Sequence, residues 1–510
     1  MALPMSYSHH ALSRRIADTL ALQPDSPAIE YDDRWHTWRE LTDVALRVRS
    51  FTTAHPVGRR QVGVLLRNRP EHVAAFLGVL LGNGTVVVIN PARGDERTRA
   101  DIADLRLPLI IGAPEDLSTL DTLPPGTAAV SICGLDGELR LSASAGRRAH
   151  TGTTRSGVAV RMLTSGTTGP PKRIDITYDM LARSVIGPDP DAVPAPAQPR
   201  RGIAIVNAPL VHIGGVFRVL QCVAEARPFV LLPRFELERW ARAVRTHRPK
   251  AVSLVPAALR MVLHSDLTAA DLAGIRVVTS GTAPLSAADA DAFREKFGIP
   301  VLTSYAATEF GGGVAGWTPA DHRKYWDAKR GSVGRATGGA RLRVVDEDGA
   351  VLGPDRPGLL EVVPGQLGPS ADWIRTTDMA RIDADGFLWI LGRADQAIIR
   401  GGFKIMPDDV RAALESHPAV LGAVVVARPD ERLGETPVAM VELRHARSAR
   451  PGDLIEYLRT RLAPYEIPAD IAIVAAIPRT PSGKADLIAV RSHFDAPAGA
   501  VRHGAEHRAR

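Results

Sequence analysis

The sequence predicts an α/β protein with more than one domain, and three observations support this. Between residues 60 and 310, short apolar runs rich in β-branched residues alternate with helix-like segments, as in the repeating units of a parallel sheet. Aromatic residues make up only 5% of the chain, so alanine, valine and leucine carry the core, which suits helices on both faces of a sheet. At 510 residues the chain exceeds what one hydrophobic core usually supports.

The predicted units follow one another in order along the first 300 residues. A strand at 61–66, a helix at 71–81 and a strand at 85–89 form the first unit. Later apolar runs predict strands at 109–111, 204–206, 229–232, 251–255 and 277–279, with helices at 236–247, 257–264 and 286–297. So many strands require either one large sheet or two, and we expect two stacked sheets covered by helices.

The pattern changes after Arg341 to short strands separated by Asp/Gly turns at 346–349 and 383–386, which predicts a small antiparallel subdomain. A smaller unit of about 100 residues follows Gly392, a reasonable size for a separate domain. Its predicted strands are 397–399, 424–426, 438–443 and 471–474, and its predicted helices are 407–416 and 453–462.

These changes give the expected domain organisation. We expect a large N-terminal domain over residues 1–393, a small α+β C-terminal domain over 394–495, and a disordered tail over 496–510. The proline-rich stretch 187–200 has no periodicity and predicts a surface loop rather than a domain boundary.

Composition excludes several classes of protein. The net charge of +7 is small for this length and the arginines are dispersed, which argues against a nucleic-acid partner. Cys133 and Cys222 cannot make a disulfide framework and have no partner at metal-ligand spacing, so we expect both to pack in a protein of a reducing compartment. The longest apolar run, 73–82, is far shorter than the roughly 20 residues of a membrane span. We therefore expect a cytoplasmic protein.

The stretch 163–172, Leu-Thr-Ser-Gly-Thr-Thr-Gly-Pro-Pro-Lys, follows a predicted strand and is suited to holding phosphate. Its hydroxyls offer donors, its glycines let backbone N–H groups approach an anion, and its lysine adds a positive charge. The candidate phosphate-binding residues are Thr164, Ser165, Gly166, Thr167, Thr168, Gly169 and Lys172. The stretch does not match the Walker pattern, and a polar surface loop is the alternative interpretation.

This loop resembles the signature phosphate loop of the adenylate-forming superfamily, which contains acyl-CoA synthetases, adenylation domains of peptide synthetases and luciferases. Further segments that resemble those of the superfamily follow in the same order: 207–215, 280–285, 304–309, 375–378, 392–395, 399–405 and 478–484. The resemblance covers roughly residues 28–487, most of the chain. Each motif alone has low specificity, but their joint order and spacing have high specificity.

The resemblance implies roles for residues of the predicted N-terminal domain. His212 would lie beside the substrate carboxylate, although a histidine after an apolar strand is often structural. Gly281, Thr282 and Ala283 would form the turn that meets adenine. In the segment 304–309, Tyr305 and Ala306 would flank the nucleotide, Thr308 would contact the α-phosphate, and Glu309 would bind Mg²⁺.

Later motifs complete the implied site. Asp378 would accept both ribose hydroxyls, Arg393 would reach the nucleotide, and Asp395 would be the hinge of a mobile C-terminal domain. Gly401 and Gly402 would line the pantetheine channel. Lys484 would bridge the substrate carboxylate and the α-phosphate, a role that suits a long, flexible cation. The resemblance thus implies catalytic roles for Lys484, Thr308, Glu309, Lys172 and His212.

The chain departs from the pattern of this superfamily at several positions. Thr282, Ala306 and Thr377 stand where glycine is usual, and the segment 362–373 is shorter than usual. Residues 311–316 match Gly-x-Gly-x-x-Gly, but without a preceding strand and a following helix they do not indicate a Rossmann site.

The resemblance implies an acyl-CoA synthetase that uses ATP and Mg²⁺ to convert a hydrophobic or aryl carboxylic acid into an acyl-adenylate, and then transfers the acyl group to CoA. A member that performs one half-reaction is an alternative, either forming thioester from a preformed adenylate or adenylating and transferring to a carrier-protein thiol. A non-catalytic AMP- or acyl-binding protein is another. CoA is the expected acceptor because the chain contains no carrier domain. The number of subunits stays open, a homodimer included.

Overall fold

The computed structural model describes residues 10–54, 61–120, 122–143, 157–164, 172–401, 403–445, 447–480 and 483–495. It confirms an α/β protein. The chain forms two compact units: the first comprises most residues up to Arg341 together with 363–372, and the second comprises 342–362 and the residues from Trp373 onward. The predicted domain boundary at residue 393 falls inside the second unit and stays a prediction. The predicted tail lies outside the described residues.

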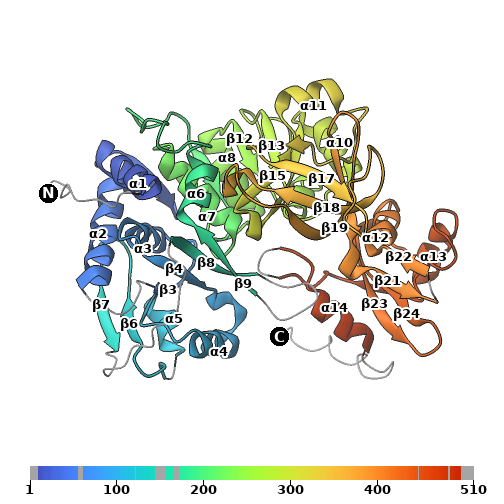
Figure 1. The fold of residues 1–510 in the computed structure, drawn as a ribbon, viewed down its shortest axis with the longest axis horizontal. Helices are drawn as coiled ribbons and strands as arrows, with labels where there is room; N and C mark the ends of the chain where they lie inside the picture. The colour runs from blue at the N-terminus through green and yellow to red at the C-terminus, as the bar shows by residue number, and fades with distance from the viewer. Residues whose placement is uncertain are drawn as a thin grey trace. The chain divides into compact units, whose positions relative to one another are not determined.

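The first unit contains a seven-stranded sheet of order β7-β6-β5-β3-β4-β8-β9. Its strands are β3 (Gln61–Leu65), β4 (Thr85–Ile89), β5 (Leu109–Gly112), β6 (Ala128–Ser131), β7 (Arg140–Ala143), β8 (Val158–Thr164) and β9 (Lys172–Thr177). The strands from β6 to β8 in this order run parallel, and both edge strands are antiparallel to their neighbours (Figure 1). The parallel strands read as continuous apolar runs because both faces of the sheet are covered.

Two adjoining sheets complete the strands of this unit. The sheet β10-β11-β1-β2 is made of β1 (Pro27–Tyr31), β2 (Arg34–Thr37), β10 (Ala204–Val206) and β11 (Phe229–Leu231). The sheet β12-β13-β14-β15-β16 is made of β12 (Ala251–Ser253), β13 (Val277–Ser280), β14 (Val301–Ala307), β15 (Gly312–Gly316) and β16 (Arg335–Ala336). Strand β10 contacts β12, so the two sheets lie next to each other. More than one sheet was expected, and this is confirmed.

Helices cover these sheets. They are α1 (Ala11–Leu22), α2 (Trp38–Ala54), α3 (Pro70–Leu81), α4 (Asp95–Leu105), α5 (Pro114–Ser118), α6 (Tyr178–Val185), α7 (Ile213–Ala224), α8 (Leu237–His247), α9 (Pro256–Leu263), α10 (Ala287–Phe297) and α11 (Pro319–Tyr325), with short 3-10 helices η1 (Pro91–Arg93), η2 (Thr308–Phe310) and η3 (Gly365–Leu367). Every residue of α3 is buried, and α2 packs closely along it. At Gly78 a Cβ would lie 2.5 Å from the Ala45 carbonyl oxygen, so only glycine permits this approach.

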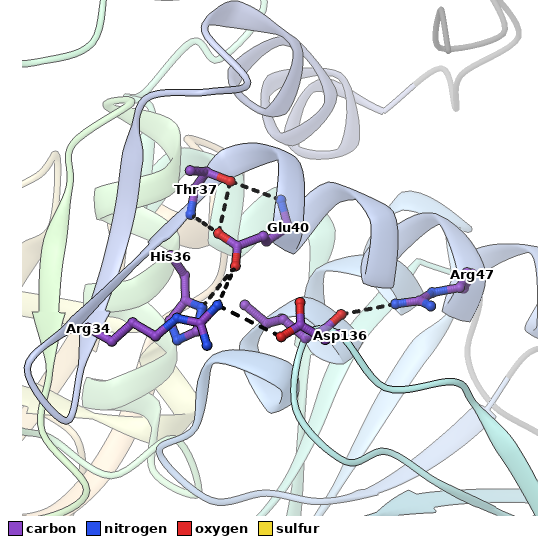
Figure 2. A network of polar contacts seen from close by, with 7 residues as sticks. Arg34, His36, Thr37, Glu40, Arg47 and Asp136 are labelled. Carbon is purple, nitrogen blue, oxygen red and sulfur yellow. Dashed lines mark hydrogen bonds and ion pairs between the residues drawn. The ribbon is translucent and has the colours of Figure 1, made fainter.

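Helix α2 begins at a capping box. The Thr37 N–H donates to Glu40 Oε2 at 2.6 Å, and the Glu40 N–H donates to Thr37 Oγ1 at 3.2 Å, so two free N–H groups of the helix start are satisfied. The Glu40 carboxylate also contacts His36 at 3.3 Å and Arg34 at 3.4 Å (Figure 2). A further ion pair joins Arg34 to Asp136 at 3.8 Å. These contacts fasten the β2–α2 corner to the segment before β7.

The second unit contains two sheets. The antiparallel sheet β17-β18-β19-β20 is made of β17 (Arg341–Val345), β18 (Gly358–Val363), β19 (Ile374–Ile382) and β20 (Leu388–Arg393). Both predicted Asp/Gly turns are present, since the Gly349 N–H donates to the Asp346 carbonyl and the Gly386 N–H to the Asp383 carbonyl. The predicted antiparallel subdomain therefore exists.

The other sheet of this unit carries the C-terminal helices. Its strands are β21 (Ile398–Arg400), β22 (Phe403–Ile405), β23 (Val420–Asp430), β24 (Gly434–Leu443) and β25 (Asp470–Val474), and it is accompanied by η4 (Ala394–Gln396), α12 (Pro407–Glu415), α13 (Pro451–Arg459) and α14 (Leu487–Asp495). One face of the sheet packs on α12 and α13 around Ile398, Val410, Leu414 and Leu454, all fully buried. Strands and helices alternate as predicted.

Three smaller expectations can be compared with this fold. Residues 187–200 form an irregular, mostly exposed loop, as predicted. None of the helices in the described ranges is both long and apolar enough to cross a bilayer. Cys222 is buried, but the expectation that Cys133 packs is wrong, because it is exposed just after β6.

Candidate active site

The predicted phosphate loop joins two antiparallel strands. Its first and last candidate residues, Thr164 and Lys172, are register partners at the end of the β8–β9 pair. Lys172 is exposed. Residues 165–171, which include Ser165, Gly166, Thr167, Thr168 and Gly169, lie outside the described residues. The strand pair therefore fixes where the loop starts and ends.

Strand β9 packs against η2, which holds Thr308 and Glu309. The strand that starts at Lys172 is thus adjacent to the predicted α-phosphate and Mg²⁺ residues, although the two segments are more than 130 positions apart in sequence. Glu309 is exposed and Thr308 is partly buried. The exposed carboxylate of Glu309 can bind a cation, and the exposed ammonium group of Lys172 can bind phosphate. Because their elements adjoin, both groups can act on one polyphosphate.

The segment around Tyr305 ends strand β14 with a bulge. The antiparallel register with β15 shifts between Tyr305 and Ala306, and Ala306 then pairs with Gly313. The rings of Tyr305 and Phe310 lie 6.0 Å apart and are tilted by 57°. Tyr305 is partly buried, whereas the neighbouring Ala306 is exposed.

The predicted adenine turn follows strand β13, whose neighbour β14 runs parallel to it. A Cβ at Gly281 would lie 2.9 Å from Ser304 Oγ, so glycine is needed for close approach to the strand that carries Tyr305. Thr282 and Ala283 are exposed. The carboxyl ends of parallel strands are where α/β folds bind ligands.

Thr282 has a left-handed backbone, with a φ of 71°. A β-branched residue rarely adopts this conformation, which costs it about 1–2 kcal/mol relative to the right-handed regions. The turn thus keeps the backbone shape that glycine would adopt, even though glycine is absent. Strain of this kind persists only where the surroundings impose it.

His212 occupies the N-cap position of α7, without a capping hydrogen bond from its side chain. It is partly buried, and its Nε2 atom is shielded from solvent. The next turn of the helix is held close to the preceding loop, since a Cβ at Gly215 would lie 2.2 Å from the Pro209 carbonyl oxygen. Helix α7 also packs against β15. His212 and the Ala306–Gly313 pair are therefore carried by elements that touch one another.

The shortened segment 362–373 supports this region through Gln366. The buried Gln366 side chain donates from Nε2 to the Gly313 carbonyl at 2.9 Å, and the Gln366 carbonyl accepts from Arg183 Nη1 at 3.2 Å. The Gly311 carbonyl next to η2 accepts from Ser184 Oγ at 2.8 Å. Side chains of helix α6 and η3 thus support β15 through these hydrogen bonds. Gln366 was not among the predicted site residues, although the short segment that carries it is evident in the sequence.

In the second unit, Asp378 and Arg393 are register partners in the β19–β20 pair. Arg393 forms a bidentate ion pair with Asp395, with Nε to Oδ1 at 2.8 Å and Nη2 to Oδ2 at 2.6 Å. Burial raises the pKa of Asp395, but the Arg393 contact and a hydrogen bond from Thr377 lower that pKa overall. Thr377 was expected only to replace the usual glycine. Its side chain in addition lowers the pKa of the predicted hinge residue.

Two further predicted residues lie elsewhere in this unit. Lys484 is exposed beside a tight turn, in which the Thr480 N–H donates to the Lys484 carbonyl at 2.7 Å and Gly483 has a φ of 79°. Gly401 ends β21 with a φ of 56°, and its N–H donates to the Leu433 carbonyl at 2.8 Å. Gly402 lies outside the described residues. The structure therefore groups Asp378, Arg393 and Asp395, while Lys484 and Gly401 belong to separate elements of the same unit.

Comparison with known proteins gives two family matches. Residues 16–365 match the family model described as AMP-binding enzyme, and residues 409–484 match the model described as AMP-binding enzyme C-terminal domain. The first match alone covers more than half of the chain.

Similar proteins align with nearly the whole chain. The 4-coumarate–CoA ligase-like 5 of Oryza sativa subsp. japonica is 28% identical over 512 residues, which is 95% of this chain and 89% of that protein. The indoleacetate–CoA ligase of Aromatoleum aromaticum is 28% identical over 500 residues, 93% of this chain and 96% of that protein. The crystal structure of ATP-bound MatB from Rhodopseudomonas palustris has a TM-score of 0.78 at 23% identity, covering 96% and 99% of the two chains.

Proposed function

The chain belongs to the AMP-binding enzyme family and is an adenylate-forming acid–CoA ligase, and we propose that it activates a carboxylic acid with an apolar or aryl body and transfers it to CoA. The observation that carries the assignment of residues is the contact between β9 and η2. It supports one phosphate-binding region formed by Lys172 at the start of β9 and by Thr308 and Glu309 in η2.

A carboxylate is a poor acyl donor because its leaving group would be oxide. The first half-reaction replaces this leaving group with AMP. A carboxylate oxygen attacks the α-phosphorus of ATP, the bond to the bridging oxygen breaks, and pyrophosphate leaves with the electron pair. Negative charge collects on the departing phosphates. Lys172 and the loop hydroxyls Ser165, Thr167 and Thr168 hold that charge, an electrostatic contribution of a few kcal/mol.

Glu309 fits a Mg²⁺ ion that is bound mainly by substrate. Mg²⁺ in nucleotide enzymes commonly takes one or two carboxylates and completes its coordination with phosphate oxygens and water. The described residues contain no cluster of three or more metal-ligating side chains, whereas Glu309 offers one exposed carboxylate beside Thr308. The ion would neutralise charge on the pyrophosphate.

Residues of the second unit have proposed roles of their own. Asp378 accepts the ribose hydroxyls, Arg393 contacts the nucleotide, and Lys484 stabilises the attacking carboxylate against the α-phosphate. In the second half-reaction the CoA thiol loses its proton and attacks the acyl carbon, and AMP leaves with the former carboxylate oxygen. Gly401 and Gly402 line the path of the pantetheine arm, and the C-terminal domain turns about Asp395 between the two steps.

Three further features belong to the proposal. CoA is the acceptor rather than a carrier-protein thiol, which the CoA ligases among the similar proteins support. The free cysteines Cys133 and Cys222 support a cytoplasmic location. His212 lies beside the reacting carboxylate, which its place at the start of α7 supports.

A panel of carboxylic acids tests this function when AMP release and CoA-thioester mass are scored together. A ligase gives both products for the same acid. Pyrophosphate exchange separates the alternatives: a protein that uses only a preformed adenylate shows no exchange with any acid but converts acyl-AMP and CoA to thioester. A protein that binds nucleotide without any turnover across the panel would contradict the proposal.

A further inference from the structure

Arg218 is the only charged residue of helix α7, whose sequence is Ile-Gly-Gly-Val-Phe-Arg-Val-Leu-Gln-Cys-Val-Ala. Seven residues of this helix are buried. Helix α7 begins directly after His212 and packs against β15. A long cation in such a helix needs a reason, because its burial costs free energy unless the charge is paired.

The contacts of Arg218 are neutral. Its Nη2 donates to Thr279 Oγ1 at 3.2 Å, and its Nη1 donates to Gln221 Oε1 at 3.1 Å. Burial lowers the pKa of the Arg218 guanidinium, and the nearby Cys222 and Glu225 oppose this effect only in part. The guanidinium thus keeps donors that its protein partners do not use.

Glu225, the acidic side chain that raises the pKa of Arg218, already has other partners. Glu225 Oε2 lies 3.0 Å from Arg227 Nε, and Glu225 Oε1 lies 3.1 Å from Arg200 Nη1. Within the ranges that the structure describes, no carboxylate forms an ion pair with Arg218. Among the described side chains, Arg218 therefore has no ion-pair partner, whereas Arg200 and Arg227 both form ion pairs with Glu225.

The contacts of Arg218 place it next to the elements of the proposed site. Thr279 precedes Gly281 by two residues on β13, and Gly281 abuts Ser304, the neighbour of Tyr305. Helix α7 contacts β15, whose Gly313 pairs with Ala306. Arg218 thus lies among the same strands that carry the proposed adenine turn and Tyr305.

The helix face in front of Arg218 is open at Gly214. Gly214 lies one turn before Arg218 on the same face, and a Cβ built there would meet no heavy atom within 4 Å. Long side chains on a helix lean toward the preceding turn, that is, toward Gly214. Gly313 and Ala306 on the neighbouring strands are small and exposed. The open space beside His212 therefore extends toward the guanidinium of Arg218.

We infer that Arg218 is a specificity-determining residue that binds a second anionic group, a carboxylate, at the distal end of the acid substrate. This inference rests on the proposed function, because it assumes that an acid occupies the space beside His212. A guanidinium binds a carboxylate through two parallel hydrogen bonds, and Thr279 and Gln221 hold its plane in place. The substrate class is then an acid with an apolar body and two carboxylates, of which one reacts.

Matched acids test the inference. Straight-chain monocarboxylic and dicarboxylic acids of equal length, and benzoic acids with and without a carboxylate-bearing side chain, are compared by kcat/KM for AMP formation. Wild-type protein should prefer the diacid of each pair. Arg218→Met should lower kcat/KM for the diacid at least about tenfold, the effect of losing one charged hydrogen bond, and should change the value for the monoacid far less. Arg218→Lys should retain part of the preference.

Arg227→Met is the control, since it removes an arginine that contacts Glu225 but not the proposed subsite. It should leave the diacid-to-monoacid ratio unchanged. Preference of the wild type for monoacids would overturn the inference and leave the ligase function intact, even if Arg218→Met failed to fold. Equal loss for both acids in Arg218→Met would also overturn it, because a structural role predicts that result. Absence of AMP and thioester with every acid would overturn both proposals.

Discussion

Arg393 forms a bidentate ion pair with Asp395 at 2.8 and 2.6 Å, and the Thr377 side chain also lowers the pKa of the Asp395 carboxyl. A side chain that stands where the superfamily usually has glycine thus acts on the residue that we propose as the hinge. Asp395 is exposed, and its pKa lies below the ordinary value because the Arg393 and Thr377 contacts outweigh the effect of desolvation.

Removing the Thr377 hydroxyl should weaken this contact in a pH-dependent way. Thr377→Val should lower the free energy of unfolding by about 1 kcal/mol at neutral pH, since the carboxylate loses one donor. A depressed carboxyl pKa contributes stability above its unfolded value, and that stability is lost as the pH falls through the folded pKa. The difference between Thr377→Val and wild type should therefore vanish in acid. Urea unfolding at both pH values measures it, and Thr377→Ser is the control. A difference of the same size at both pH values would contradict the assignment.

Lys484 should be required for the first half-reaction but not for the second. Lys484→Ala should abolish adenylate formation from acid and ATP, because the charge that stabilises attack on the α-phosphate is gone. The same variant should still form thioester from supplied acyl-adenylate and CoA. Rapid-quench measurement of each step separates them. If both steps fall equally, Lys484 has no role specific to adenylation.

Thr282 should carry a measurable backbone strain. Its φ of 71° costs a β-branched residue about 1–2 kcal/mol. Thr282→Gly removes this cost, but glycine has more conformational freedom in the unfolded chain, which offsets part of the gain in stability. Thermal unfolding should therefore show an equal or higher Tm for this variant. The matched substitution Thr303→Gly, in the extended strand β14, should lower Tm. A clear loss of stability in Thr282→Gly would show that the turn is not strained.

His72 should make stability rise with pH in weak acid. Burial lowers its pKa to about 4, so the unfolded state binds more protons than the folded state between about pH 4 and 6.5. Across that range, stability should fall with decreasing pH by up to about 1.4 kcal/mol per pH unit from this group. His72→Asn keeps an acceptor for the Arg67 N–H, which donates to His72 Nδ1 at 2.9 Å. Its unfolding free energy should depend less steeply on pH in that range, and an unchanged slope would contradict the account.

Much of the fold followed from periodicity. The predicted helices 71–81, 236–247 and 286–297 lie within one residue of α3, α8 and α10, because the apolar stripe and the end signals agree there. The Asp/Gly turns after Arg341 were equally clear. The partition into compact units was not foreseen, since it depends on contacts of 342–362 and 373–393 that no local pattern encodes.

Motifs that fix both residue type and spacing led to the prediction of Thr308, Glu309 and Asp378 as site residues, and their roles stay predictions. Contacts between distant segments were not predicted. Gln366 reaches Gly313 across 53 positions and Arg218 reaches Thr279 across 61, and neither pair has a signal in its own sequence window. A single arginine in an otherwise uncharged helix was visible in the sequence and could have drawn attention to Arg218.

The fate of the carboxylate oxygen tests the central claim most directly. An acid that is turned over is labelled with a heavy oxygen isotope in its carboxyl group, and the AMP formed in the presence of ATP and CoA is analysed by mass spectrometry. If the carboxylate attacks the α-phosphorus and the thiol then breaks the acyl–oxygen bond, each AMP carries one labelled oxygen. Unlabelled AMP, or ADP in its place, would contradict adenylate formation.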